Sequence, residues 1–151
     1  MRKHLIAAAA LVAAGLTVPP ALADDGEAAI GHRKDVMNVA GAAMGAIGCF
    51  MKGDCALPNK VLVRNANAIA YAGEASVAAF ETDTTDSMAQ TTALPAIWEK
   101  WDMFEGGLNA MTEAANELAV ASAEGDRSAM GPAVEKLGGT CKDCHDNFRE
   151  K

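Results

Sequence analysis

The chain has 151 residues, half of them hydrophobic, and its 20 acidic residues outnumber its 13 lysines and arginines. A chain of this length supports one domain with one hydrophobic core. Its negative charge excludes nucleic acid and anionic membrane surfaces as partners, because both repel an acidic surface.

Residues 1–23 have the features of a secretory signal peptide. Arg2-Lys3-His4 forms a basic start, a short apolar run follows, and residues 21–23 form an A-x-A cleavage sequence. The apolar run is shorter than the ~20 residues of a membrane-spanning helix. We therefore expect a mature domain, residues 24–151, that is exported to the periplasm and has no membrane span. Processing leaves 11 basic against 20 acidic residues in that domain, a net charge of −9.

The first predicted helix covers residues 27–51 and ends at Gly53. Apolar residues recur along it with the spacing of a seam between nearly parallel helices. They are Ile30, Met37, Ala40, Met44, Ile47 and Met51. Gly41 and Gly45 lie four residues apart, so we expect another backbone to approach closely there.

Cys49 and Cys55 flank the end of this helix. The chain has four cysteines, and the other two belong to a motif near the C-terminus that is described below. The pair that remains lies in an oxidising compartment, which predicts a disulfide between the helix end and the following loop. Two separately buried thiols are the alternative, because the distance between the two Cα atoms does not follow from sequence.

The second and third helices are predicted over residues 59–80 and 95–123, with a polar loop over residues 81–93 between them. The third helix has an inner stripe of apolar residues at helical spacing. These are Ile97, Trp101, Phe104, Leu108 and Met111.

The last helix is predicted to begin at Asp126, a natural N-cap, and to run to about residue 149. Pro132 lies inside this pattern, so it kinks the helix or marks a start nearer Ser128. The inner face carries Val134, Leu137, Cys141, Cys144 and Phe148. Because no alternating strand pattern occurs, we predict an all-α, up-down-up-down four-helix bundle.

Residues 141–145 read Cys-Lys-Asp-Cys-His, a CxxCH motif typical of c-type haem attachment. The two thiols add to the vinyl groups of the porphyrin, and one helical turn spans the gap between them. His145 then lies over the iron as an axial ligand. We predict one haem c, covalently bound through Cys141 and Cys144 inside the bundle near one end.

Other uses of a CxxC pair fit the sequence less well. A zinc site needs about four ligands, and the spacing of Cys49 and Cys55 is too long for a second CxxC knuckle. A thioredoxin-like pair belongs in an alternating strand and helix context, which the chain does not show. Unmodified thiols at Cys141 and Cys144, in a helical metal-binding or adaptor module, are the remaining non-haem alternative.

Two residues of the first helix bear on what lies opposite His145. Arg33 is on or beside the inner stripe, where a charge is costly unless it is paired or reaches water. A haem propionate would be a suitable partner; the alternative is a side chain that extends to water at the helix end. Met37 offers a thioether that could be the sixth iron ligand, although periodicity alone favours a space-filling core methionine.

These features resemble the class II cytochromes c, which include the high-spin cytochromes c′ and the low-spin cytochrome c-556 type. The resemblance covers the mature chain. It is carried by Arg33 and Met37 in GHRKDVMNVAGAAMGAIG, by Ile97-Trp98 with Phe104, and by KLGGTCKDCHDNFREK at the C-terminus. It implies that His145 is the proximal ligand, that Arg33 and Lys34 lie near the propionates, and that Arg149 lies near the proximal imidazole.

The two branches of the family differ at the position of Met37. In the low-spin branch this methionine binds iron. In the high-spin branch a bulky apolar residue, which can itself be methionine, blocks the distal face without bonding to iron. The run from Met37 to Gly53 is slightly more similar to the low-spin branch.

We therefore predict a one-electron carrier that cycles between Fe(III) and Fe(II), with Met37 as sixth ligand. The alternative is a five-coordinate protein that binds nitric oxide or carbon monoxide. Neither function needs side-chain catalysis, so we do not expect an enzyme. A redox protein with a basic docking patch is the expected partner, and the resemblance implies a homodimer.

Overall fold

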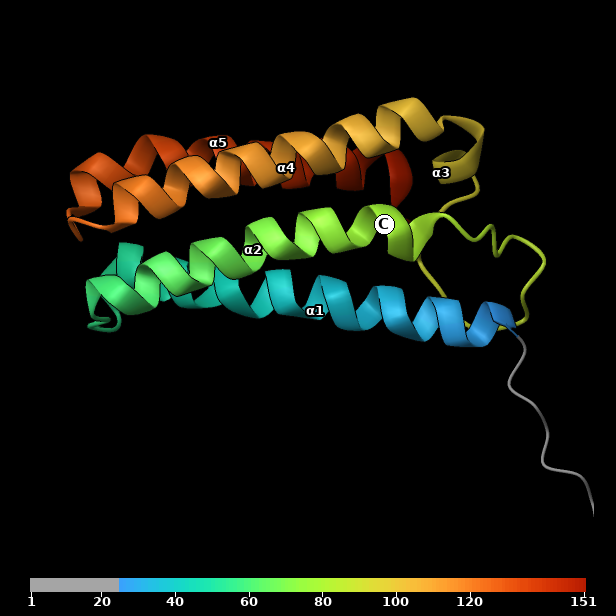
Figure 1. Cartoon of the computed structure of the whole chain (residues 1–151), viewed down its shortest axis with the longest axis horizontal. Coiled ribbons are helices and arrows are strands. Elements are labelled where there is room, and N and C mark those ends of the chain that lie inside the picture. Colours follow the sequence, from blue (N-terminus) through green and yellow to red (C-terminus); the bar gives the residue numbers. More distant parts are fainter. Residues whose placement is uncertain (1–24) are drawn as a thin grey trace, which may run out of the picture.

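The structure, a computed structural model, describes residues 25–151, and the predicted signal peptide lies outside this part of the chain. Four long helices and one short helix form here: α1 (Asp25–Lys52), α2 (Asn59–Phe80), α3 (Ala96–Glu99), α4 (Trp101–Ser122) and α5 (Arg127–Phe148). The long helices alternate in direction along one axis (Figure 1). The predicted all-α, up-down-up-down bundle is therefore confirmed. None of these helices combines the length and the hydropathy that a membrane crossing requires.

The ends of the helices follow largely from local sequence. α1 ends before Gly53, whose φ of +80° is readily adopted only by glycine. Gly125, with φ +69°, lies between α4 and α5. Asp126 caps α5, because its Oδ1 accepts a hydrogen bond of 2.8 Å from the backbone N–H of Ser128. This predicted N-cap is confirmed, and Pro132 lies inside α5 without ending it.

The single helix predicted over residues 95–123 is wrong, because the chain forms α3 and α4 instead. Lys100, with φ −131° and ψ 47°, separates them. The indole N–H of Trp98 donates a hydrogen bond of 2.8 Å to the carbonyl of Phe80 at the end of α2. No glycine or proline marks the break, so the sequence pattern does not predict it. Trp101 of the predicted inner stripe is only half-buried, whereas the other four residues are buried.

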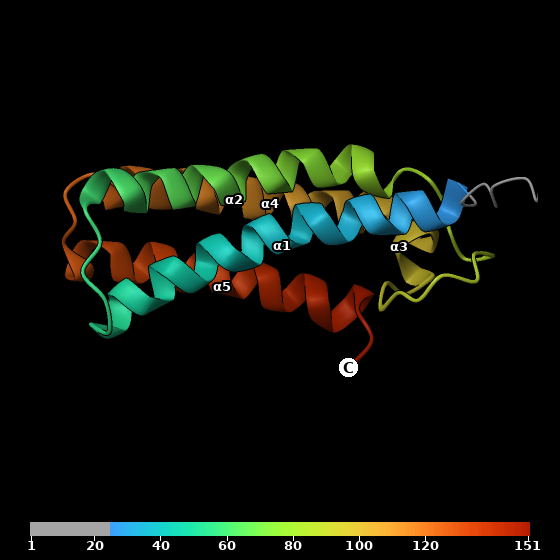
Figure 2. The ribbon, with the colours of Figure 1, turned by 90° about the horizontal axis from the view of Figure 1, so that it is seen from below.

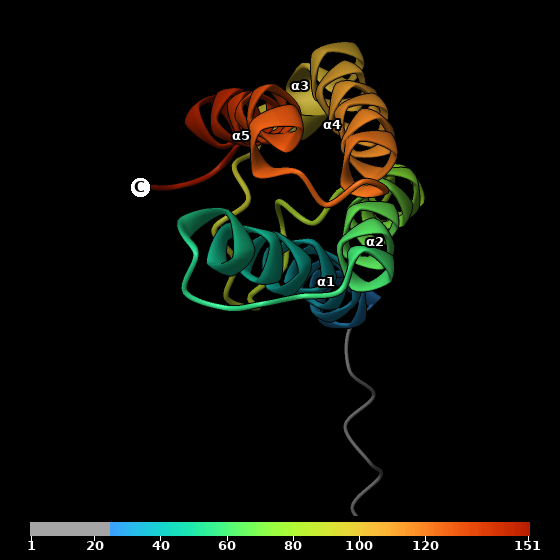
Figure 3. The same cartoon turned by 90° about the vertical axis from the view of Figure 1, so that its left-hand side faces the viewer.

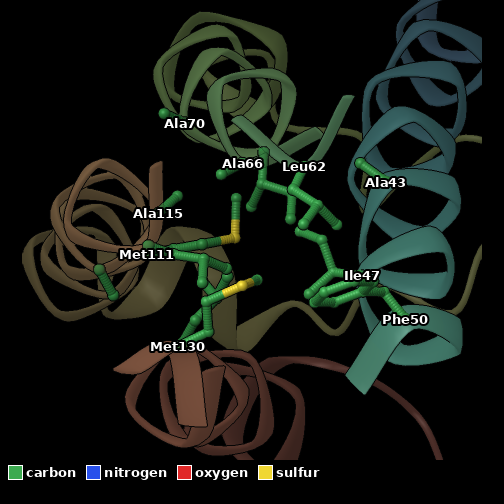
Figure 4. Close-up of a cluster of buried hydrophobic side chains, with 13 residues drawn as sticks. Ala43, Ile47, Phe50, Leu62, Ala66, Ala70, Met111, Ala115 and Met130 are labelled. Atoms are coloured by element: carbon green, nitrogen blue, oxygen red, sulfur yellow. The ribbon is translucent and has the colours of Figure 1, made fainter. Parts of the chain in front are cut away.

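Two clusters of buried side chains form the core. The larger joins α1, α2, α4 and α5, and Figure 4 shows Ile47, Leu62, Met111 and Met130 pointing toward one another within it. The smaller is aromatic: the ring centroid of Phe104 lies 5.0 Å from that of Phe80 and 5.2 Å from that of Phe148. Fully burying such a side chain stabilises the fold by about 1.5–3 kcal/mol. The aromatic cluster also contacts Met37 and Cys144.

The buried stripe of α1 differs from the predicted seam. Ile30 and Ile47 are buried as predicted, but Met37, Met44 and Met51 are only half-buried. The place of the methionines in the core is taken by Ala43 and Phe50, with Arg33 near the start of the helix. The physical reason is that Met37 and Met44 line a cavity instead of packing fully against a neighbouring helix.

The close backbone approach that Gly41 and Gly45 allow does not occur among residues 25–151, because a Cβ added at either position would meet nothing else in this part of the chain within 4 Å. The close approach occurs instead at Gly73 of α2, where a Cβ would overlap Thr112 Oγ1 and lie 3.3 Å from the carbonyl oxygen of Leu108 in α4.

Candidate haem site

A cavity of about 870 Å³ lies between α1 and α5. Its wall also includes residues of α4 and of the loop between α2 and α3, and it is mainly apolar. Figure 3, which looks along the bundle, shows α1 and α5 together on one side and α2 and α4 on the other. In Figure 2, α1 crosses α5 at an angle. The volume lies within the roughly 300–1,000 Å³ typical of cofactor sites.

All seven residues predicted to surround a haem line this one cavity. They are Arg33, Lys34, Met37, Cys141, Cys144, His145 and Arg149. The bundle therefore brings together residues that are more than a hundred positions apart in the sequence. His32, by contrast, is exposed and does not line the cavity.

The CxxCH motif occupies the last two turns of α5. Cys141 and Cys144 are half-buried, and neither forms a disulfide. Gly107 of α4 lies beside Cys144, because a Cβ added at this glycine would lie 3.9 Å from both Cβ and Sγ of the cysteine. His145 is exposed toward solvent at the cavity wall. The two thiols thus lie one helical turn apart, as covalent attachment of a porphyrin requires.

The two thiols lie in a partly apolar environment. Burial raises the pKa of Cys141, and it raises the pKa of Cys144 to about 11. Within residues 25–151, no group of three or more His, Cys, Asp or Glu side chains could hold a metal ion without a cofactor. The non-haem alternative thus lacks a ligand set in this region.

The surroundings of His145 favour its neutral imidazole. Burial lowers the pKa of its imidazole, and the positive charge of Arg149 lowers it further, while Asp146 opposes both effects. The neutral imidazole has a lone pair for a metal ion. Arg149 is tied to the same turn, since its backbone N–H donates a hydrogen bond of 3.2 Å to the carbonyl of His145.

The α1 side of the cavity is shaped to receive a flat group. Gly41, Gly45 and Gly48 lie on one face of α1 and line the cavity, and a Cβ at any of them would meet no other part of the chain within 4 Å. Met37 and Met44 lie on the same wall. A strip of backbone without side chains, facing two thiols one turn apart, fits a porphyrin.

The position of Arg33 contradicts one of the two alternatives considered on sequence, the side chain that extends to water. Its side chain does not extend to water, because the residue is only 3% exposed. Nε donates a hydrogen bond of 2.9 Å to the carbonyl of Ala79, Nη1 donates one of 2.7 Å to Thr84 Oγ1, and Nη2 donates one to the carbonyl of Thr82. The guanidinium carbon also lies 5.0 Å from the ring centroids of Phe80 and Trp98. Arg33 thus joins α1 to the end of α2.

A loop and the C-terminal tail close the same end of the cavity. Lys34 Nζ donates a hydrogen bond of 2.5 Å to the carbonyl of Gln90. The backbone N–H of Leu94 donates to the carbonyl of Phe148 at 3.0 Å, and that of Glu150 donates to the carbonyl of Thr92 at 2.8 Å. Residues 91–93 therefore line the cavity beside the haem-binding turn. Sequence reasoning missed these residues and Thr84, because a polar loop shows no periodicity that would assign them to a site.

The two remaining cysteines lie at the opposite end of α1. The structure joins Cys49 to Cys55 with 5.6 Å between their Cα atoms, and Cys49 lines the cavity. This Cα separation lies within the range of disulfides. Arg127 of α5 reaches this region as well. Its Nε donates a hydrogen bond of 2.7 Å to the carbonyl of Phe50, and its guanidinium carbon lies 4.4 Å from the centroid of the Phe50 ring.

The chain matches known proteins over this whole architecture. The family model of cytochrome c′ matches residues 28–149. A cytochrome c′ of Rhodospirillum rubrum is 39% identical over 149 residues, 99% of each chain. A cytochrome c′ of Pararhodospirillum photometricum is 39% identical, and the match covers 82% of this chain and 98% of that protein. The crystal structure of cytochrome c′ from Rubrivivax gelatinosus has a TM-score of 0.73 at 27% identity and covers 83% of this chain and 97% of its own.

Fold and site together define a four-helix-bundle protein with a c-type haem. The chain belongs to the cytochrome c′ family. It accordingly binds one haem c covalently, through Cys141 and Cys144 of its CxxCH motif. When bound, this group supplies an iron that can exchange one electron or take up a small ligand.

Proposed function

We propose that this chain is an exported haem protein whose iron is five-coordinate and binds small neutral gases such as nitric oxide or carbon monoxide. The observation that carries the proposal is the packing of Met37. Its half-buried side chain contacts the aromatic cluster of Phe80, Phe104 and Phe148 while it lines the cavity. These contacts support a space-filling role for Met37 on the distal side in place of a bond to iron.

The known relatives also support gas binding over one-electron transfer. The low-spin carrier with Met37 as sixth ligand, which the sequence placed first, has less support than its alternative, because the strongest similarities are to proteins named cytochrome c′. One-electron transfer with Met37 bound to iron is kept as the second candidate.

Each residue of the cavity wall has a role in this proposal. His145 is the proximal ligand. Burial and then the charge of Arg149 lower the pKa of its imidazole, and the backbone N–H of Arg149 bonds to the carbonyl of His145. Arg33 and Lys34 serve the acidic groups of the haem. A guanidinium has five N–H donors, and the three hydrogen bonds of Arg33 leave two for a carboxylate. Met37 and the glycine face of α1 limit the distal space to small ligands.

The proposal extends to location and partners. Residues 1–23 read as a secretory signal peptide, and haem c is attached outside the bacterial cytoplasm, which supports a periplasmic protein. A homodimer is included, as the class II resemblance implies. A redox protein would supply or remove the electron that sets the iron in its ferrous, gas-binding state. No side-chain chemistry is assigned, so we do not propose an enzyme.

The test is an absorption spectrum of the ferrous, haem-loaded protein with and without carbon monoxide. We expect a broad high-spin spectrum that shifts when carbon monoxide is added. Met37→Ala should leave the spectrum without gas almost unchanged and should speed gas binding, because the variant opens the distal space. Met103→Ala is the matched control, since Met103 lies exposed on α4 away from the cavity.

A sharp low-spin spectrum unmoved by carbon monoxide, which becomes high-spin only in Met37→Ala, would identify Met37 as the sixth ligand. The electron carrier would then replace the gas-binding function. Absence of any c-type haem spectrum would contradict both functions.

A further inference from the structure

Arg33 is the only charged side chain that is buried within residues 25–151. It is also part of the wall of the haem cavity. A buried charge is costly to maintain unless other groups stabilise it. The effect of the Arg33 charge on the haem depends on how the protein stabilises that charge.

The protein groups around Arg33 stabilise its charge without cancelling it, so the charge remains available to the haem, including the acidic groups that Arg33 is proposed to meet. Its hydrogen-bond acceptors are two carbonyl oxygens and the hydroxyl of Thr84, and its two ring contacts are to Phe80 and Trp98, all of them neutral. None of the ion pairs among residues 25–151 includes Arg33; they involve Lys136, Lys142 and Lys151. The nearest acidic influence is Asp83, an exposed residue that solvent screens.

A fixed positive charge at the cavity wall favours the haem state with the lower positive charge. Reduction adds one electron to the iron and converts Fe(III) to Fe(II), with the electron supplied by a redox partner or mediator. Away from water, the interaction between this electron and a nearby cation is screened weakly. We infer that the charge of Arg33 raises the reduction potential of the haem, an inference that rests on the proposed haem site.

The test is a potentiometric titration of the haem-loaded protein and its variants with redox mediators. In Arg33→Gln, which removes the charge, we expect the equilibrium constant for reduction to fall about tenfold, which corresponds to about 59 mV for a one-electron couple. Arg33→Lys keeps the charge but not the planar fork, so its potential should stay close to that of the parent protein.

Lys60→Gln is the matched control. Lys60 of α2 carries the same charge, but it is exposed and does not line the cavity. We expect less than a twofold change in the equilibrium constant for this variant. An equal shift in Lys60→Gln and Arg33→Gln would overturn the inference, because removal of any cation would then have the same effect. An equal shift in Arg33→Lys and Arg33→Gln would overturn it too, since lost hydrogen bonds would explain the effect.

A second variant tests the charge with Arg33 in place. Thr84→Asp puts a carboxylate at the acceptor of Nη1, 2.7 Å away in the parent protein, and should lower the potential by neutralising the guanidinium. Thr84→Asn is its neutral control and should not. A folded, haem-loaded Thr84→Asp protein with an unchanged potential would refute the inference alone. A parent protein without covalent haem by intact mass would refute the proposed function instead.

Discussion

Gly73 has a packing role that only its neighbours reveal. It lies where α2 and α4 come closest, with Thr112 and the backbone of Leu108 next to the position of a Cβ. Gly106 of α4, by contrast, has no other part of the chain within 4 Å of that position. The same residue type thus permits helix packing at one site and only weakens a helix at the other.

We expect Gly73→Ala to lower the free energy of unfolding by about 1–3 kcal/mol, because the added methyl group forces α2 and α4 apart. Gly106→Ala is the control and should raise the free energy of unfolding by about 0.5–1 kcal/mol through helix propensity. Denaturant unfolding of the haem-loaded proteins measures both. A stabilised Gly73→Ala protein would show that the two helices separate easily.

At the scale of single elements, the start of α5 matters most, because this helix carries the haem-binding residues. Asp126 caps it through the N–H of Ser128. We expect Asp126→Ala to lower the free energy of unfolding by about 1 kcal/mol, while Asp126→Asn should retain most of the cap. Denaturant titration distinguishes the two variants. Equal losses in both would assign the effect to the charge of the aspartate and not to the cap.

The end of α1 is held by two separate devices, the link between Cys49 and Cys55 and the contact of Arg127 with Phe50. The linked cysteines are six residues apart in sequence. In the chain-entropy account, closing a loop of that size lowers the conformational entropy of the unfolded chain and stabilises the fold by about 2 kcal/mol. The double variant Cys49→Ser, Cys55→Ser should therefore lose about that much stability.

Thiol titration under denaturing conditions gives the matching chemical test. The parent protein should show no free thiol from this pair until it is reduced. If titration detects both thiols without reduction, the two cysteines are separately buried, as in the alternative considered on sequence.

At the scale of the whole molecule, the haem cavity exists because α1 and α5 are held at both ends. Arg127 links the start of α5 to the end of α1. At the other end, Arg33 and Lys34 hold the loop after α2, and this loop pairs with the tail after α5 through Thr92 and Leu94. Between these contacts, residues of both helices line the cavity. The helices held in this way enclose a cavity with apolar walls, which has room for a flat cofactor.

The sequence by itself determined the four helices, their main ends and the covalent haem site. These features depend on neighbouring residues: a cap and its N–H lie two positions apart, and CxxCH is five consecutive residues. Tertiary structure alone decided the break at Lys100, the orientation of Met37 and Met44 toward the cavity, and the burial of Arg33. Arg33 bonds to Ala79 and Thr84, 46 and 51 positions away, so its environment exists only after the helices pack. Periodicity identifies which face of a helix is apolar, whereas the packed bundle decides whether that face meets another helix or a cofactor.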